Sequence, residues 1–229
     1  MASLEEVQAH ESKLYYELAH VYDRVFTRVF SPRIERVIRS LNIEPGARVI
    51  EVGAGTGLSF AAYPAHCQVT GIDLAPEMLE KAQEKIDRNG WRHLKVIEMD
   101  ALDLKFQDNS FDYAMAFHVV SVVPDAARLM REVLRVTRPG GTVVIINHFR
   151  SRNRLLATLD MLVEPIWRRL GWHTLAIEDV VAGVPLEVER TYKTSSRSLF
   201  TIVIGKNRKA EATAEAETAD GQSRRRAAV

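Results

Sequence analysis

The sequence predicts an α/β fold with a mostly parallel sheet that is covered by helices on both faces. Two observations favour this fold. Short apolar segments rich in β-branched residues alternate with charged segments of helical periodicity between about 47 and 205. A glycine-rich turn directly follows the first of the apolar segments, at residues 53–57. Strands this apolar are buried on both sides, and the helices between them supply the cover.

The strands and helices follow from local pattern. We expect strands at 47–52, 68–74, 94–99, 111–117 and 142–147. The helix at 76–88 has Pro76 in its first turn, and the helix at 126–136 stops before Arg138-Pro139-Gly140-Gly141. A further helix is expected to open directly after the glycine turn. The segments at 186–192 and 199–204 alternate and fit an antiparallel pair.

Composition divides the chain into three regions. Residues 1–40 are helical in pattern and form an amphipathic arm, and residues 41–206 form the α/β domain. Residues 207–229 contain no aromatic side chain and are expected to be disordered, because they cannot bury enough apolar surface to offset their ordering entropy.

Charge and cysteine content exclude several classes of protein. Lys and Arg number 31 and Asp and Glu number 30, so the net charge of +1 argues against a nucleic-acid-binding protein. The single cysteine, Cys67, excludes a disulfide framework and a cysteine-rich zinc site, and we expect no metal. The first residues are acidic, unlike a secretory signal, and no apolar run is long enough to span a membrane. A cytoplasmic location is expected.

Polar groups follow three consecutive strands. The turn Gly53-Ala-Gly55-Thr-Gly57 has the spacing GxGxG, which fits a smaller cofactor better than a dinucleotide. Asp73 ends the second strand, 20 residues after Gly53, where a carboxylate can accept hydrogen bonds from two ribose hydroxyls. Asp100 ends the third strand and can accept from an adenine amine. Ligands of open α/β sheets bind at this carboxyl edge.

These motifs resemble the class I S-adenosylmethionine-dependent methyltransferases. The resemblance rests on VIEVGAGTG, GIDLAPEMLEKA, MDALDL, SFDYAMAFHVVSVVPD and LRVTRPGG, between residues 40 and 150. It implies a Rossmann-like seven-stranded sheet with a reversed last strand. It also implies S-adenosylmethionine as cofactor and S-adenosylhomocysteine as product. The implied contacts are Glu51, Gly53 and Gly55 at the methionine end, Asp73 at the ribose, Leu74 and Met78 beside the adenine, Asp100 and Ala101 at its edge, and Phe117 and His118 near the methyl group.

Segments outside the cofactor motifs carry signals for the acceptor. Residues 13–41 combine an apolar helical stripe with bordering arginines, and Trp167 and Trp172 flank Arg168 and Arg169. An apolar helical stripe bordered by arginines fits either a lid over the site or contact with an anionic membrane surface. Tryptophan beside arginine is typical of a membrane–water interface, although a helix that covers the substrate gives the same pattern.

These outer segments resemble bacterial phosphatidylethanolamine N-methyltransferases of the Rhodobacter type. The resemblance rests on YYELAHVYDRVF, INHFRS and EVERTYK. It implies a membrane-associated enzyme at the inner face of the cytoplasmic membrane, which adds methyl groups successively to a phospholipid amine on the way to phosphatidylcholine. Ubiquinone and menaquinone C-methyltransferases share the Tyr22-Asp23 element, so a quinone precursor or a small amine stays an alternative acceptor. A cofactor-binding regulator without turnover is the non-enzymatic alternative.

The chemistry of amine methylation selects candidate residues. An ammonium group has no lone pair and must lose a proton before it can accept a methyl group, so a nearby imidazole or phenol can assist. Tyr22 and His148 are the predicted catalytic residues. Aromatic rings stabilise a methylated cation and arginine pairs with phosphate. The predicted substrate contacts are Tyr15, Tyr16, His118, Arg150 and Tyr192.

Overall fold

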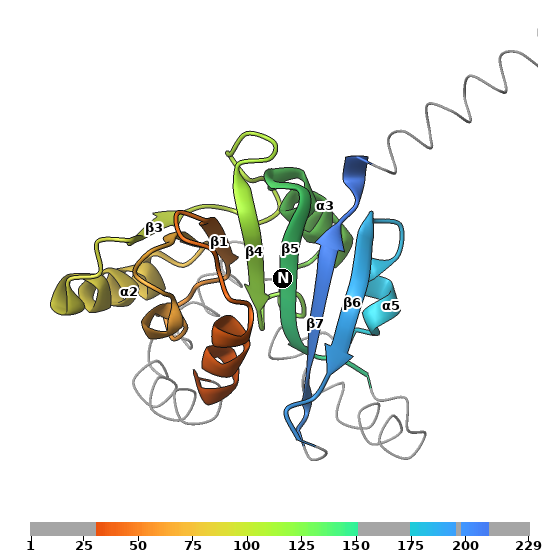
Figure 1. Cartoon of the computed structure of the whole chain (residues 1–229), viewed down its shortest axis with the longest axis horizontal. Coiled ribbons are helices and arrows are strands. Elements are labelled where there is room, and N and C mark those ends of the chain that lie inside the picture. The colour runs from red at the N-terminus through yellow and green to blue at the C-terminus, as the bar shows by residue number, and fades with distance from the viewer. Residues whose placement is uncertain (1–30, 151–174, 196–197, 211–229) are drawn as a thin grey trace, which may run out of the picture. The chain divides into compact units, whose positions relative to one another are not determined.

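A computed structural model of the chain describes residues 31–150, 175–195 and 198–210. Seven strands form one sheet in the order β3-β2-β1-β4-β5-β7-β6 (Figure 1). The chain divides between Ala101 and Leu102 into two compact units, called here the N-terminal and the C-terminal unit. The predicted boundaries at residues 40 and 206 stay a prediction.

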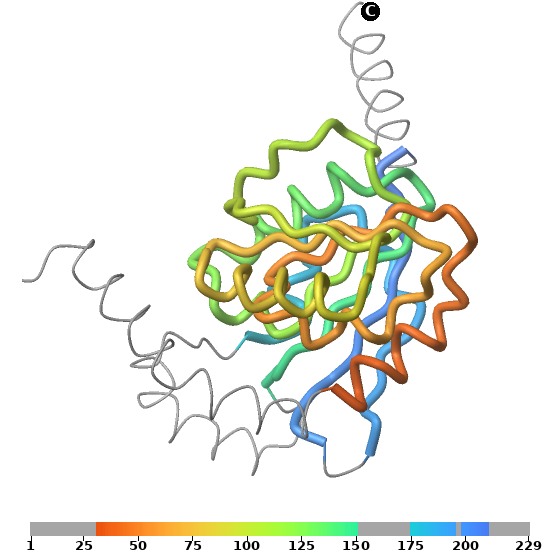
Figure 2. The backbone as a smooth tube through the Cα atoms, turned by 90° about the vertical axis from the view of Figure 1, so that its left-hand side faces the viewer, coloured from red at the N-terminus to blue at the C-terminus, as the bar shows by residue number. Residues whose placement is uncertain are grey.

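The N-terminal unit contains three parallel strands. β1 (Arg48–Val52) pairs with β2 (Gln68–Asp73), and β2 pairs with β3 (Leu94–Glu98). A helix over residues 31–40, the first coloured segment in Figure 2, precedes them and buries Ile34, Val37 and Ile38. The carboxyl ends of β1, β2 and β3 therefore meet at one edge, as predicted.

Helix α2 (Pro76–Asn89) connects β2 to β3 and packs against both strands. Pro76 lies in its first turn, and Gly90 ends it in the left-handed conformation with φ 63°. The buried residues Leu79, Ala82 and Ile86 recur at helical spacing. The periodicity that predicted this helix is therefore the apolar stripe that it buries.

The C-terminal unit contains the other four strands. They are β4 (Phe111–Phe117), β5 (Thr137–His148), β6 (Leu186–Tyr192) and β7 (Phe200–Asn207), with helices α3 (Ala126–Val136) and α5 (Ile177–Val181). β4 and β5 are parallel, whereas β7 lies antiparallel between β5 and β6. The reversed last strand is confirmed.

Strand β5 begins earlier than predicted. Thr137 ends α3 in an extended conformation and pairs with Phe111, and the next paired residues are Tyr113 and Thr142. The register shift places residues 138–141 within the strand as an irregularity, with Gly140 at φ 70°. The residues Arg138 to Gly141 were expected to separate the helix from a strand that begins at residue 142, and the structure instead includes them in β5 as a bulge.

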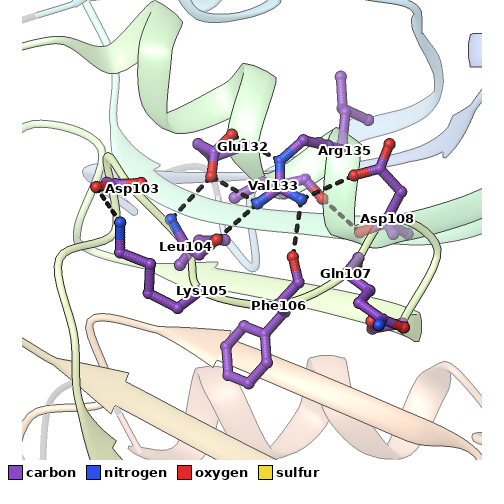
Figure 3. Close-up of polar contacts among 12 residues, drawn as sticks. Asp103, Leu104, Lys105, Phe106, Gln107, Asp108, Glu132, Val133 and Arg135 are labelled. Carbon is purple, nitrogen blue, oxygen red and sulfur yellow. Dashed lines mark hydrogen bonds and ion pairs between the residues drawn. The ribbon is translucent and has the colours of Figure 1, made fainter.

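Arg135 joins α3 to the segment that precedes β4 (Figure 3). Its guanidinium donates to the carbonyl oxygens of Leu104 at 2.7 Å and Phe106 at 2.8 Å. It also donates to Glu132 and Asp108 at 2.8 Å, and Glu132 accepts from the Leu104 N–H. This network satisfies the backbone of a segment that has no sheet partner of its own.

The end of β7 caps helix α3. Asn207 is fully buried and donates from Nδ2 to the carbonyl oxygens of Leu134 at 2.9 Å and Thr137 at 2.8 Å. Lys209 Nζ donates to the carbonyl oxygens of Leu134, Arg135 and Thr137. Carbonyl groups that a helix leaves unpaired at its C-terminus are thus satisfied from a distant part of the chain.

Several predictions concern residues outside the described ranges. These are the arm before residue 31, the segment with Trp167 and Trp172, and the tail after residue 210. Among the helices that the structure describes, none combines the length and the apolar character needed to cross a bilayer.

Candidate active site

The glycine turn after β1 is not followed by the predicted helix. Gly53, Gly55 and Gly57 all have positive φ, at 70°, 52° and 71°, so the chain cannot run helically through them. A single 3-10 turn, η1 (Phe60–Ala62), follows. Tyr63 is extended because it precedes Pro64, and this ends the turn. The prediction of a helix at this point is therefore wrong.

The Phe60 ring supports the turn from below. It is 1% exposed and lies between two glycines that leave room for it. A Cβ built on Gly57 would lie 2.6 Å from Phe60 Cδ2, and one on Gly71 would lie 3.1 Å from Phe60 Cζ. A Cβ on Gly55 would meet nothing within 4 Å. The turn is thus packed against Phe60 at Gly57 and has open space at Gly55.

Asp73 holds the turn at the end of β2. Its Oδ2 accepts from the Gly55 N–H at 2.8 Å and its Oδ1 accepts from the Ala75 N–H at 3.0 Å. Burial raises the pKa of Asp73, while these hydrogen bonds act in the opposite direction. A carboxylate offers about four lone-pair sites in total, so Asp73 retains capacity to accept from a ribose hydroxyl.

Lys85 holds the turn from helix α2. Its Nζ donates to the Thr56 carbonyl oxygen at 2.8 Å and lies 3.2 Å from Thr56 Oγ1. Gly55, at the middle of the glycine turn, is therefore held from strand β2, and Thr56 beside it is held from helix α2.

Glu51 lies beneath the turn and is 3% exposed. Ser59 Oγ donates to it and lies 2.7 Å from both carboxylate oxygens, and the Tyr63 hydroxyl donates to Oε2. Burial raises the pKa of Glu51 to about 7, although both hydroxyls lower it. Burial and the neighbouring Glu51 raise the pKa of Tyr63. The role predicted for Glu51 at the methionine end stays a prediction.

The remaining predicted cofactor residues of this unit lie near the same strand ends. Leu74 directly follows β2 and is 64% exposed, which leaves it open for contact with a flat ring. Met78 is half-buried in the first turn of α2. Asp100 is exposed two residues after β3, and Ala101 is half-buried beside it.

The arrangement defines a class of protein. An open glycine turn after the first strand and an aspartate at the end of the second are the parts of a Rossmann-like domain that binds a nucleoside cofactor. The open space above Gly55, the remaining lone pairs of Asp73 and the exposed Leu74 fit the main chain, ribose and adenine of S-adenosylmethionine. Among the residues that the structure describes, no cluster of His, Cys, Asp and Glu suited to a metal ion occurs.

In the C-terminal unit, two histidines that were predicted as site residues contact the ring of one phenylalanine. Phe117 is the buried last residue of β4, and His118 follows it. The Phe200 ring centroid lies 4.8 Å from that of His118 and 6.2 Å from that of His148. We call these three residues the His118–Phe200–His148 cluster. The contact predicted between Phe117 and the cofactor stays a prediction.

Other predicted substrate residues are placed separately. Arg150 is exposed two residues after β5, and its N–H donates to the Leu175 carbonyl oxygen at 2.9 Å. Tyr192 is the half-buried last residue of β6 and is paired with Ile202. Tyr15, Tyr16 and Tyr22 lie outside the described residues.

Comparisons with known proteins identify the family of the chain. Residues 50–145 match the family model described as "Methyltransferase domain". The chain is 40% identical over 190 residues to a phosphatidylethanolamine N-methyltransferase from Cereibacter sphaeroides, an alignment that covers 82% of this chain and 93% of the relative. It is 33% identical over 153 residues to a demethylmenaquinone methyltransferase from Geobacillus kaustophilus, covering 60% of this chain and 64% of the relative.

A solved structure is similar in fold. It is a geranyl diphosphate methyltransferase in complex with S-adenosylmethionine, with a TM-score of 0.67 and 16% identity over 79% of this chain and 86% of that chain. The chain belongs to the class I S-adenosylmethionine-dependent methyltransferases, and S-adenosylmethionine is its cofactor.

Sequence reasoning missed several residues of the site. Ser59 and Tyr63 carry a weak signal, because they lie four residues apart directly after the glycine turn. Lys85 could not be found from pattern, since it lies 29 residues from its partner Thr56. Phe200 gave no more signal than any aromatic residue at the start of a strand.

Proposed function

We propose that the chain is a phosphatidylethanolamine N-methyltransferase that methylates a phospholipid amine stepwise toward phosphatidylcholine at a membrane surface. The observation that carries the proposal is the 40% identity to the Cereibacter enzyme over 190 residues. The methyltransferase model itself spans only residues 50–145, so the identity extends well beyond the cofactor-binding core. The acceptor of a methyltransferase is selected by such flanking segments, because the fold does not determine it.

The alternative acceptor is a quinone precursor. The demethylmenaquinone methyltransferase from Geobacillus kaustophilus aligns with the chain over 153 residues, fewer than the 190 of the phospholipid enzyme, and at lower identity. Its similarity supports a shared methyltransferase core. It favours a quinone acceptor less than the similarity to the phospholipid enzyme favours an amine acceptor.

The chain's own residues have three tasks in amine methylation. The bound cofactor supplies an activated methyl group on a sulfonium, so the protein must align the nucleophile with it. The acceptor ammonium must lose a proton, a role that we assign to His148 and Tyr22. Tyr15, Tyr16 and His118 stabilise the cationic headgroup, and Arg150 and Tyr192 contact the lipid phosphate.

The substrate determines the place of action. A phospholipid remains in the bilayer, so the enzyme must work at the inner face of the cytoplasmic membrane as a peripheral protein. The arginines beside the apolar stripe of residues 13–41 fit an anionic lipid surface. We propose the phospholipid and the anionic membrane as partners, and no nucleic acid.

One incubation tests the acceptor. The purified full-length chain is incubated with methyl-labelled S-adenosylmethionine and mixed vesicles that contain phosphatidylethanolamine and a demethylated quinone, and the lipids are separated by chromatography. We expect label in the monomethyl, dimethyl and trimethyl lipids in succession. Label on the quinone, or on neither lipid, would refute the proposal.

A second experiment tests the membrane. The full-length chain is sedimented with vesicles of neutral lipid or with vesicles that also contain anionic lipid, at low and at high salt. Binding that depends on anionic lipid and weakens in high salt is expected, because salt screens surface charge. Equal binding to both vesicle types would argue against an electrostatic attachment.

A further inference from the structure

Two strands of the C-terminal unit bring His148 and Phe200 together. His148 ends β5, Phe200 begins β7, and the two residues are paired across the antiparallel ladder. The rings of His118 and His148 both meet the Phe200 ring nearly at right angles, with interplanar angles of 88° and 75°. Phe200 therefore contacts both imidazoles at the carboxyl ends of β4 and β5.

A backbone carbonyl determines which nitrogen of His148 carries hydrogen. His148 Nδ1 lies 2.9 Å from the carbonyl oxygen of Leu199. A carbonyl oxygen only accepts hydrogen bonds, so Nδ1 must be the donor in the neutral ring and in the charged ring. In the neutral ring the hydrogen is then absent from Nε2. Nε2 is therefore the ring nitrogen that carries the basic lone pair.

The backbone around both histidines is held in place. Asn147 is 1% exposed, donates from Nδ2 to the His148 carbonyl oxygen at 3.0 Å, and accepts from Ser121 Oγ at 3.2 Å. His118 has φ 60°, a left-handed conformation that persists in a non-glycine residue only where the surroundings enforce it. Its N–H donates to the Ile146 carbonyl oxygen at 2.7 Å, so β5 fixes the backbone of both residues.

We propose that Nε2 of His148 accepts the proton of the acceptor ammonium, and that the Leu199 carbonyl and Phe200 are the positioning groups that keep the ring in this tautomer. The inference rests on the proposed function. In the step, one N–H bond of the ammonium breaks, its electron pair stays on the amine nitrogen, and the proton bonds to Nε2. The imidazolium that forms donates a stronger, charge-assisted hydrogen bond from Nδ1 to Leu199.

The same geometry serves each round of methylation. After the first and the second transfer the nitrogen is again an ammonium with at least one N–H, and it must lose a proton before the next transfer. After the third transfer no N–H remains, so no base is needed. Conversion to the trimethyl lipid therefore requires three proton removals, each followed by loss of the proton from Nε2 to water.

Nuclear magnetic resonance tests the tautomer without any activity. The full-length chain is labelled with ¹⁵N in its imidazoles, and proton–nitrogen correlations are recorded in alkaline buffer. His148→Asn assigns the signals by their loss. We expect a protonated Nδ1 and an unprotonated Nε2. A protonated Nε2, or an average of both tautomers, would overturn the proposal.

Matched phenylalanine variants test the positioning role. Phe200→Leu is expected to give a mixture of His148 tautomers while the backbone amide spectrum stays folded. Phe106→Leu is the control, because Phe106 contacts Phe111 in the same unit and neither histidine in the described contacts. If both variants leave the tautomer unchanged, Phe200 has no positioning role.

A rate measurement completes the test. In His148→Asn the amide N–H can replace Nδ1–H toward Leu199, whereas nothing replaces Nε2. We expect methyl transfer to fall about 100-fold or more, with S-adenosylmethionine affinity by calorimetry within about twofold of the wild type. Methyl transfer at the wild-type rate would overturn the role of His148 as the base and would leave the proposed function in place. Label on a quinone carbon, with Nδ1 still protonated, would overturn the proposed function and with it the ammonium as proton source.

Discussion

Gly57→Ala tests how the glycine turn is built. Gly57 has φ 71°, and an added Cβ would lie 2.6 Å from Cδ2 and 2.7 Å from Cε2 of Phe60. These are ring atoms, and the ring is 1% exposed. Its Cζ side faces Gly71, where an added Cβ would lie 3.1 Å away, so the buried ring has little room to move away from the new methyl group.

Two costs add in this variant. An alanine in the left-handed conformation costs about 1 kcal/mol relative to glycine. Forcing a methyl group into a packed interior typically costs about 1–3 kcal/mol. We therefore expect Gly57→Ala to lower the free energy of unfolding by about 2–4 kcal/mol.

Urea denaturation with two matched variants separates the two costs. Gly46 and Gly55 also have positive φ, at 78° and 52°, but a Cβ on either would meet nothing within 4 Å. Gly46→Ala and Gly55→Ala are expected to lose only the backbone cost of about 1 kcal/mol. If Gly57→Ala loses no more than Gly46→Ala, the Phe60 ring yields and the packing argument fails.

The same series distinguishes stability from ligand binding. The methyl group of Gly55→Ala would project into the open space above the turn, where we expect the cofactor. Calorimetry is therefore expected to show S-adenosylmethionine affinity reduced about tenfold or more in Gly55→Ala, and unchanged in Gly46→Ala. Equal affinity in both variants would place the cofactor elsewhere.

Three further predictions concern charged groups. Asp73→Asn is expected to weaken S-adenosylmethionine binding about 10- to 100-fold in calorimetry, because an amide replaces an acceptor of ribose hydroxyls; Asp87→Asn, on the exposed side of α2, is the control and should bind normally. Because the pKa of Glu51 is raised in the folded chain to about 7 from its ordinary value of 4.5, the folded state binds the proton more tightly. Stability in urea is therefore expected to fall as pH rises from about 4.5 to about 7, and Glu51→Gln should remove most of this dependence. Arg135→Met is expected to destabilise by about 2–3 kcal/mol, since it removes the guanidinium that donates to two carbonyl groups and to Glu132, which keeps only the Leu104 N–H. Arg138→Met, which breaks an exposed pair, should cost less than about 1 kcal/mol; equal losses would contradict the network.

The strands and helices that could be predicted are those whose pattern is local. The helix at Pro76–Asn89 and the strand at Phe111–Phe117 were expected within a residue or two, because burial imposes their spacing on the sequence. The helix after Gly57 was not correctly predicted, because three left-handed glycines and Pro64 leave room for only one 3-10 turn. Local apolar spacing cannot show a backbone conformation that a packed ring enforces.

The residues of the candidate site also fall into those that the sequence could predict and those that it could not. Asp73 was predictable since it stands at a strand end at a fixed separation from the glycine turn, and the structure places it on the Gly55 N–H. Lys85 acts across 29 residues, and Leu199 acts through its carbonyl oxygen, a group that every residue possesses. Contacts of these kinds depend on tertiary structure, and the residue types in the sequence do not indicate them.

The place of β7 between β5 and β6 has a consequence for biosynthesis. During translation β5 emerges about fifty residues before β7, so its apolar edge has no partner on that side until nearly the whole chain has left the ribosome. The same final strand delivers Asn207 and Lys209 to the end of α3. The nascent C-terminal unit is therefore open to aggregation while the residues between β5 and β7 are synthesised, and a stop codon shortly before residue 200 would leave that edge exposed permanently.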